Sequence, residues 1–231
     1  MQLLSLHLHP LKSAAAIAVD TLDIAARGPR GDRRWLVVDA DRRFITARKQ
    51  AEIVLITALP DGDGLQLSAP GMPAIAVATP AADAARMRVR IWDDEVDAVI
   101  AHDDANAWLS AYLKRAVTLV HMDARSRRTI DGPHAQPGDQ VSFADGYPLL
   151  AISQAALDAL NARLASPITM ARFRPNLVIA GCAAHAEDGW QRVRIGDLVF
   201  EASKACTRCV FTTIDPITGQ RDPGGEPLRT L

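Results

Sequence analysis

The sequence predicts a mainly β protein of the α+β class, built in two parts with one or two helices. Short segments rich in apolar and β-branched residues fill the first hundred positions, and Gly, Pro or Asp turns separate many of them. Closely spaced short strands are typical of an antiparallel barrel or sandwich and not of alternating βαβ units. Helical periodicity appears only twice, and 231 residues can form one large core or two small ones.

The strands expected in the first part follow one another closely. Residues 3–9, LLSLHLH, alternate with a period of two, as a half-buried strand does. The turns DGDG at 61–64 and APGMP at 69–73 separate later segments. The other expected strands are residues 16–24, 33–40, 44–48, 52–59, 64–69, 74–79 and 86–92.

The first expected helix covers residues 103–115, where Trp108, Leu109, Tyr112 and Leu113 recur at helical spacing. Asp103 or Asp104 is the expected N-cap. We place the boundary between the two parts near this helix, around residues 100–120.

The second part begins with an expected strand at 116–122. Residues 123–148 are polar and contain several Gly and Pro, so they predict a long loop, and loops of this length are usually functional or disordered. A second helix is expected from Ser153 over SQAALDALNARL. The last expected strands are residues 176–181, 191–203 and 209–215.

Composition excludes several classes of protein. The formal net charge of -1 argues against a protein that binds nucleic acid or membrane surfaces through bulk charge. Three cysteines are too few for a disulfide scaffold. The N-terminus lacks the pattern of a signal peptide, and no uncharged apolar run approaches the roughly 18 residues of a membrane helix. We therefore expect a soluble cytoplasmic protein with reduced thiols.

The pair Cys206-Thr-Arg-Cys209 allows three kinds of chemistry. With Cys182 and His185 upstream it has the spacing of a Cys₃His zinc site, although Gly-bearing knuckle turns are absent around these pairs. A thioredoxin-like pair needs a helix after its first cysteine, and strand-forming residues follow here. A single thiolate ligand beside Arg208 is the third interpretation, because a cationic neighbour favours the thiolate. These residues alone leave zinc and the single thiolate open.

Some basic residues accompany the cysteines at suggestive positions. Arg174 precedes Pro175, which disfavours helix and predicts an extended chain there. Lys12, next to Ser13, and Arg33 lie where expected strands pass into turns. Taken singly, each is typical of a solvated surface charge.

Motifs in a fixed order nevertheless resemble those of the MOSC family, whose domain is similar to the C-terminal domain of molybdenum-cofactor sulfurase. They are PLKS, GDRRW, FITAR, FRPN, AEDGW, IGD and CTRC followed by TTIDPITG. The likeness is greatest to the amidoxime-reducing members. It implies an N-terminal MOSC-type β-barrel domain at 1–115 and a MOSC β-barrel domain at 116–231. Family members usually continue past the position of Leu231, which leaves open whether the second domain is complete.

The resemblance also implies a cofactor and its binding residues. The cofactor is a Mo-pyranopterin, the molybdenum cofactor, and Cys209 corresponds to the protein ligand of the metal. Asp145, in a loosely matched loop, is a candidate proton donor, although a turn role is the more usual one for Asp before Gly. The residues implied to contact the cofactor are Lys12, Ser13, Arg33, Gly146, Tyr147, Arg174, Asn176, Thr207 and Arg208.

The reaction implied by the resemblance is reduction of a small N-hydroxylated or otherwise N-oxygenated compound. The sequence has no cysteine cluster for an iron–sulfur centre, so electrons would come from a separate reductase or a ferredoxin-like protein. No nucleic-acid or membrane partner is expected. Two alternatives remain: a sulfur or cofactor carrier with a persulfide on Cys209, and a structural zinc protein using Cys182, His185, Cys206 and Cys209.

Overall fold

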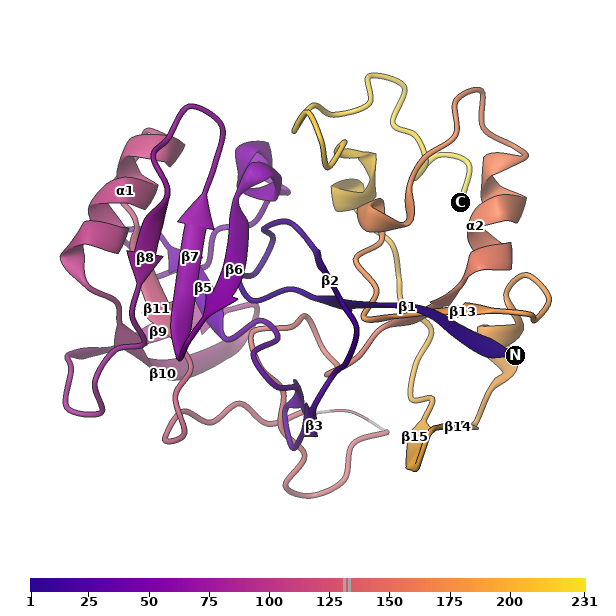
Figure 1. The fold of residues 1–231 in the computed structure, drawn as a ribbon, viewed down its shortest axis with the longest axis horizontal. Coiled ribbons are helices and arrows are strands. Elements are labelled where there is room, and N and C mark those ends of the chain that lie inside the picture. The colour runs from indigo at the N-terminus through magenta and orange to yellow at the C-terminus, as the bar shows by residue number, and fades with distance from the viewer. Residues whose placement is uncertain (131, 133) are drawn as a thin grey trace.

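A computed structural model describes residues 1–130, 132 and 134–231 of the protein (Figure 1). Within these residues the fold is mainly β, with two α-helices, which confirms the predicted class. The strands are β1 (Gln2–Leu8), β2 (Ile17–Val19), β3 (Ile24–Ala25), β4 (Gly28–Pro29), β5 (Trp35–Val38), β6 (Thr57–Asp61), β7 (Gly64–Ser68), β8 (Ile75–Val77), β9 (Arg86–Ile91), β10 (Asp94–Ile100), β11 (Thr118–His121), β12 (Ala151–Ser153), β13 (Leu177–Ala180), β14 (Arg192–Ile195) and β15 (Leu198–Glu201). The helices are α1 (Asp103–Leu113) and α2 (Gln154–Asn161), and the 3₁₀ turns are η1 (Ala51–Leu55), η2 (Met170–Arg172), η3 (Ala186–Gly189) and η4 (Val210–Thr213).

The first body, on the left of Figure 1, contains a four-stranded sheet in the order β5-β11-β10-β9 and a three-stranded sheet β6-β7-β8. Helix α1 buries Trp108, Leu109 and Leu113 in the core that these sheets share. The indole of Trp108 donates to the carbonyl of Pro73 at 2.6 Å, which satisfies its one polar atom.

The second body, on the right of Figure 1, is organised around the sheet β12-β13-β1-β2 and helix α2. Strand β1 opens the chain but pairs antiparallel with β13, which lies more than 160 residues later. Conversely, β11 pairs with β5 and β10 of the first body. Because the sheets mix early and late segments, the division at 115/116 stays a prediction.

Two segments predicted as strands form 3₁₀ turns. Residues 51–55 turn so that Ile53 and Val54 are both buried, and β6 begins only at Thr57. Residues 210–213 turn because threonine hydroxyls bond to backbone three residues earlier: Thr212 Oγ1 donates to Cys209 O at 2.9 Å and Thr213 Oγ1 to Val210 O at 2.7 Å. Such local bonds override the strand propensity of β-branched residues.

The helix ends were predicted with mixed success. Ser153 is the N-cap of α2, and its Oγ accepts from the backbone N–H of Ala156 at 3.2 Å. The N-cap of α1 is His102, without a side-chain cap, so the prediction of Asp103 or Asp104 is wrong by one or two positions. Both carboxylates lie instead in the first turn, where their negative charge interacts favourably with the positive end of the helix dipole and stabilises the helix.

The long segment between β11 and β12 contains no strand or helix among its described residues, and Asp131 and Pro133 lie outside the described residues. An isolated bridge joins Thr129 to Gln140. Strands β10 and β12 were not predicted from the sequence. None of the helices described is long and apolar enough to span a bilayer.

Candidate functional site

A cavity of about 360 Å³ lies where the two bodies meet. It is lined by segments that are far apart in the sequence: 12–13, 33, 46–48, 144–150, 172–176 and 204–212. Every residue that the motifs singled out for the cofactor lines it, namely Lys12, Ser13, Arg33, Asp145, Gly146, Tyr147, Arg174, Asn176, Thr207, Arg208 and Cys209. Their individual roles stay predictions.

Lys12 and Asp145 form the ion pair on one wall of the cavity. The buried ammonium of Lys12 donates to Asp145 Oδ1 and to the carbonyl of Phe143, both at 2.6 Å. Burial lowers the pKa of Lys12 to about 8, although the charge and hydrogen bond of Asp145 act in the opposite direction. For Asp145 burial acts to raise the pKa, but Lys12, Arg48 and Arg33 outweigh it, so that pKa lies well below its usual value. At neutral pH the carboxylate is therefore ionised and the proton is on Lys12.

The lowered pKa of Lys12 predicts a pH dependence of stability. Between about pH 8 and the ordinary lysine value of 10.5, the unfolded chain binds more protons at this site than the folded protein. The free energy of unfolding due to Lys12 therefore rises with pH through that window. We expect Lys12→Met to flatten the slope measured by chemical denaturation, and Lys49→Met, at an exposed lysine, to leave it unchanged.

The comparison between variants is needed because burial also lowers the pKa of Arg174 and Arg34, which adds slope of the same sign. A slope identical in the wild type and Lys12→Met would contradict the prediction.

Arg33 is held by a buried carboxylate and an amide. Its Nη1 donates to Asp32 Oδ2 at 2.5 Å and to Asn176 Oδ1 at 2.9 Å. Asn176 in turn donates to Asp32 Oδ1 and to the carbonyl of His7, both at 3.1 Å. The amide of Asn176 is thus occupied within the protein, so it orients Arg33 and ties it to β1.

Arg174 lines the cavity and has one guanidinium nitrogen without a partner among the described residues. Its Nη1 donates to the carbonyl of Ala14, while its Nη2 is buried and has no partner among the described residues. The guanidinium lies over the ring of Phe211, 5.3 Å from the centroid. Burial, together with the charge of Arg33, lowers the pKa of Arg174 to about 9. A buried cationic donor without a partner is costly, and the positive charge of this guanidinium at the cavity favours an anionic ligand there.

The backbone around the cavity departs from ordinary geometry. Ser13, Arg33 and Arg174 have φ of 69°, 46° and 59°, in the left-handed region that non-glycine residues seldom adopt. The predicted extended conformation at Arg174 is therefore wrong. Pro175 disfavours right-handed helix at this position, but the chain reverses just after η2, and Arg33 Nη2 donates to the Arg174 carbonyl at 3.2 Å. Such strain clusters at functional sites.

The segment 204–212 brings the cysteines to the cavity. Cys209 is partly buried and caps η4, where its carbonyl accepts from the N–H of Thr212 at 3.0 Å. Cys206 also borders the cavity but is exposed. The guanidinium of Arg208 lies 5.1 Å from the centroid of the Phe173 ring, which fixes this arginine between the two cysteines.

The zinc alternative receives no support from the geometry. No group of three or more His, Cys, Asp or Glu side chains in the described part of the chain could hold a metal ion, although Cys182, His185, Cys206 and Cys209 all belong to that part.

Sequence reasoning missed several residues of the cavity. Arg48 lies within the FITAR motif but received no role, and Arg172, Lys204, Phe173 and Phe211 were not singled out. The available signals were the arginine of FITAR and Arg172, which lies two positions before the arginine of FRPN. Arg172 differs from Arg174 in being paired, since its Nη2 lies 3.2 Å from Asp215 Oδ2.

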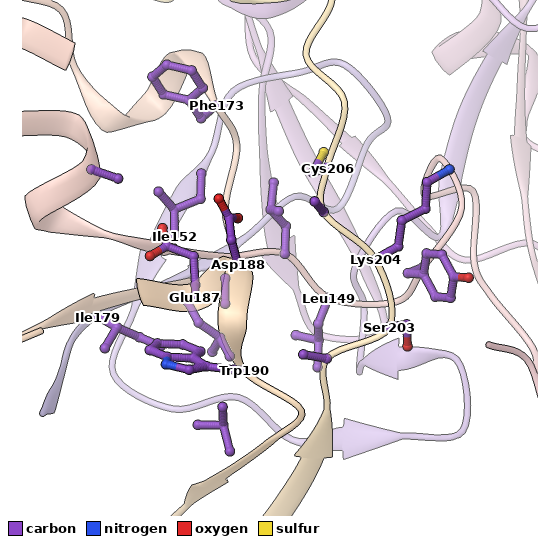
Figure 2. Close-up of a pocket in the computed structure, with 18 of the residues that line it drawn as sticks. Leu149, Ile152, Phe173, Ile179, Glu187, Asp188, Trp190, Ser203, Lys204 and Cys206 are labelled. Carbon is purple, nitrogen blue, oxygen red and sulfur yellow. The ribbon is translucent and has the colours of Figure 1, made fainter. Parts of the chain in front are cut away.

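A second cavity of about 580 Å³ adjoins the first and shares Tyr147, Leu149, Phe173, Cys206 and Arg208 with it. Figure 2 shows Leu149, Ile152, Ile179 and Trp190 around it, with Ser203, Lys204 and Cys206 along one side. Glu187 Oε1 accepts from the N–H and hydroxyl of Ser153 at 2.8 and 3.0 Å. The charged lining residues of this cavity have both signs, whereas basic residues predominate among those of the first cavity.

Comparisons with known proteins agree with the motifs. Residues 1–116 match the family model of the MOSC N-terminal beta barrel domain, and residues 138–231 match that of the MOSC domain. Mitochondrial amidoxime-reducing component 1 is 37% identical over 236 residues in Mus musculus and 35% over 240 in Homo sapiens. Mitochondrial amidoxime reducing component 2 of Bos taurus is 34% identical over 236 residues. Each alignment covers 98% of this chain and 69–70% of the relative.

Among solved structures, a solution structure of a Bordetella bronchiseptica protein covers 46% of this chain and 90% of its own, at 20% identity and a TM-score of 0.37. That score is too low to support an argument about the fold.

Proposed function

Because this chain belongs to the MOSC family, we propose that it is an oxidoreductase that binds a molybdenum cofactor and reduces N-hydroxylated compounds. The relatives named above are amidoxime-reducing components. Reduction of an amidoxime takes up two electrons and two protons, breaks the N–O bond and releases an amidine and water. A separate reductase or ferredoxin-like protein would supply the electrons.

The observation that carries the proposal is the charge of the first cavity. Among the described residues, it is lined by Lys12, Arg33, Arg48, Arg172, Arg174, Lys204 and Arg208 against one carboxylate, Asp145. Asp32 and Asp215 each neutralise one arginine from outside the lining. The excess of cationic side chains fits an anionic group such as a phosphate ester.

The residues present therefore fit the cofactor. Lys12, Ser13, Arg33 and Arg174 would hold its phosphate and pterin, Thr207 and Arg208 would contact it near the metal, and Cys209 would supply the thiolate ligand. When bound, the cofactor supplies the two-electron chemistry. Gly146 and Tyr147 would form the wall next to Asp145.

The protein itself supplies a proton-bearing pair. Asp145 is ionised at neutral pH, so it accepts hydrogen bonds, and the proton of the pair lies on Lys12 Nζ. This distribution argues that Asp145 orients the ligand and that Lys12 is the better candidate for the proton store.

Reduction of an aromatic amidoxime tests the proposed function. We expect the protein purified from a host that makes molybdenum cofactor to form the amidine, with a reduced viologen dye as electron source and chromatography as the assay. The same protein produced in tungstate medium should lose this activity, because tungsten replaces the metal. Equal turnover by both preparations, or none by the molybdenum form, would overturn the proposal.

A further inference from the structure

The turn of the β9–β10 hairpin holds a tryptophan where turn geometry disfavours one. Asp94 pairs with Ile91, so the turn consists of two residues, Trp92 and Asp93. Trp92 has a φ of 54°, and two-residue turns with positive φ favour Gly, Asn or Asp because a larger side chain is sterically strained there. A bulky aromatic residue at such a position indicates that its side chain has a task elsewhere.

That side chain contacts Asp145 of the first cavity. The indole Nε1 of Trp92 donates to Asp145 Oδ1 at 3.3 Å, the same oxygen that accepts from Lys12. The guanidinium of Arg48 lies over the indole, 4.5 Å from the ring centroid, and 3.9 Å from Asp145 Oδ2. Phe44 packs edge-on against the indole with ring centroids 4.8 Å apart. Tryptophan thus fixes both the carboxylate and the arginine beside it.

The same hairpin holds the backbone of the Asp145 loop through Arg128. Arg128 is only 5% exposed, and its Nε lies 2.7 Å from Oδ2 of Asp94, the first residue of β10. Its remaining nitrogens donate to the carbonyls of Ser142 at 2.9 Å, of Ala144, and of Asp145 at 3.1 Å. A planar guanidinium that bridges an aspartate and three carbonyls of one loop holds those carbonyls rigidly in place.

We propose that Trp92 and Arg128 are positioning residues for Asp145. Through them the β9–β10 hairpin holds Asp145 at the cavity, because Trp92 binds its carboxylate and Arg128 binds its backbone carbonyl. Both donors to the carboxylate, Lys12 and Trp92, bind Oδ1. Oδ2 faces only the Arg48 guanidinium at 3.9 Å and accepts no hydrogen bond from the described residues. It is the oxygen available to a ligand. The effect on turnover rests on the proposed function, whereas the geometry exists in the protein without cofactor.

Indole signals in the cofactor-free protein test the geometry directly. The chain has four tryptophans, so ¹⁵N-labelling of tryptophan gives four indole N–H signals, and Trp92→Phe identifies one of them. We expect Asp145→Asn to shift the Trp92 signal upfield, because a neutral amide accepts more weakly than a carboxylate. Arg128→Lys should move or broaden the same signal and leave the other three in place.

The matched control is Arg125→Lys, on the same loop. Arg125 is exposed and pairs with Asp123, away from Asp145, so its replacement should leave all four signals unchanged. A Trp92 signal that is indifferent to Asp145→Asn would overturn the proposal. A shift of all four signals in Arg128→Lys would also overturn it, since Arg128 would then support the whole fold and not the position of Asp145.

Turnover gives the functional readout. Trp92→Phe keeps a ring for Arg48 and Phe44 and removes only the donor to Asp145. We expect kcat for the amidoxime to fall about tenfold, with KM and molybdenum content unchanged. An unchanged kcat would overturn the positioning role. If the wild type shows neither molybdenum nor turnover, the proposed function fails, and the indole signals still decide whether the hairpin holds Asp145.

Discussion

Cys209→Ala is expected to release molybdenum and abolish amidoxime reduction, whereas Cys206→Ala should retain both. Thiolates select soft metals, and Cys209 is the partly buried cysteine at the cavity, fixed by the η4 turn. Cys206 is exposed and serves as the matched control three residues away. Replacing a residue that only hydrogen-bonds a metal ligand lowers the affinity for the metal about 10- to 100-fold, and replacing the ligand itself should lower it further. Elemental analysis of the two purified variants measures the difference.

Other results would identify the alternatives. Equal loss of molybdenum in both variants would contradict the assignment of Cys209. Zinc that is retained until His185 or Cys182 is replaced would favour the structural zinc protein. A stable added sulfur atom on Cys209, seen by mass spectrometry of the intact protein, would favour the carrier.

The site was predictable because its motifs are local in sequence, although the fold brings them together from distant segments. PLKS, GDRRW, FRPN and CTRC each place between one and four residues on the cavity, and every cofactor residue implied by them lies there. Spacing alone could not do this. Lys12 and Asp145 are 133 positions apart, and their contact depends on the loop 141–145 lying against Arg33 and Arg128.

The errors have a common physical origin in local bonds that propensity does not capture. Residues 209–215 have strand-forming composition, but two threonine hydroxyls close a 3₁₀ turn instead. Arg174 adopts a positive φ that Pro175 did not predict, because Arg33 binds its carbonyl after the turn η2. Trp92 and Arg128 act through tertiary contacts only, so no motif identified them.

Arg174→Gln is expected to weaken cofactor binding about 10- to 100-fold, while Arg172→Gln should weaken it much less. Both arginines line the cavity, two positions apart. Arg172 is already paired with Asp215, whereas Arg174 has a buried nitrogen without a partner among the described residues. A hydrogen bond to a charged group contributes about 1.5–3 kcal/mol, which corresponds to that loss. Molybdenum content after dialysis of the two variants, with increasing times, measures the difference in retention.

The stability of the two variants should change in the opposite order to their cofactor binding. This difference separates specific binding by Arg174 from attraction by the summed positive charge of the cavity. The free energy of unfolding of the cofactor-free protein should fall less in Arg174→Gln, since the cost of burying a cation that has no carboxylate partner among the described residues offsets its hydrogen bond to Ala14 and its contact with Phe211. It should fall more in Arg172→Gln, because Asp215 loses its partner. Equal loss of molybdenum from both variants would mean that the cavity holds its ligand by summed charge. Selective loss of molybdenum from Arg174→Gln, with the smaller loss of stability, would mean that Arg174 binds the anionic ligand specifically.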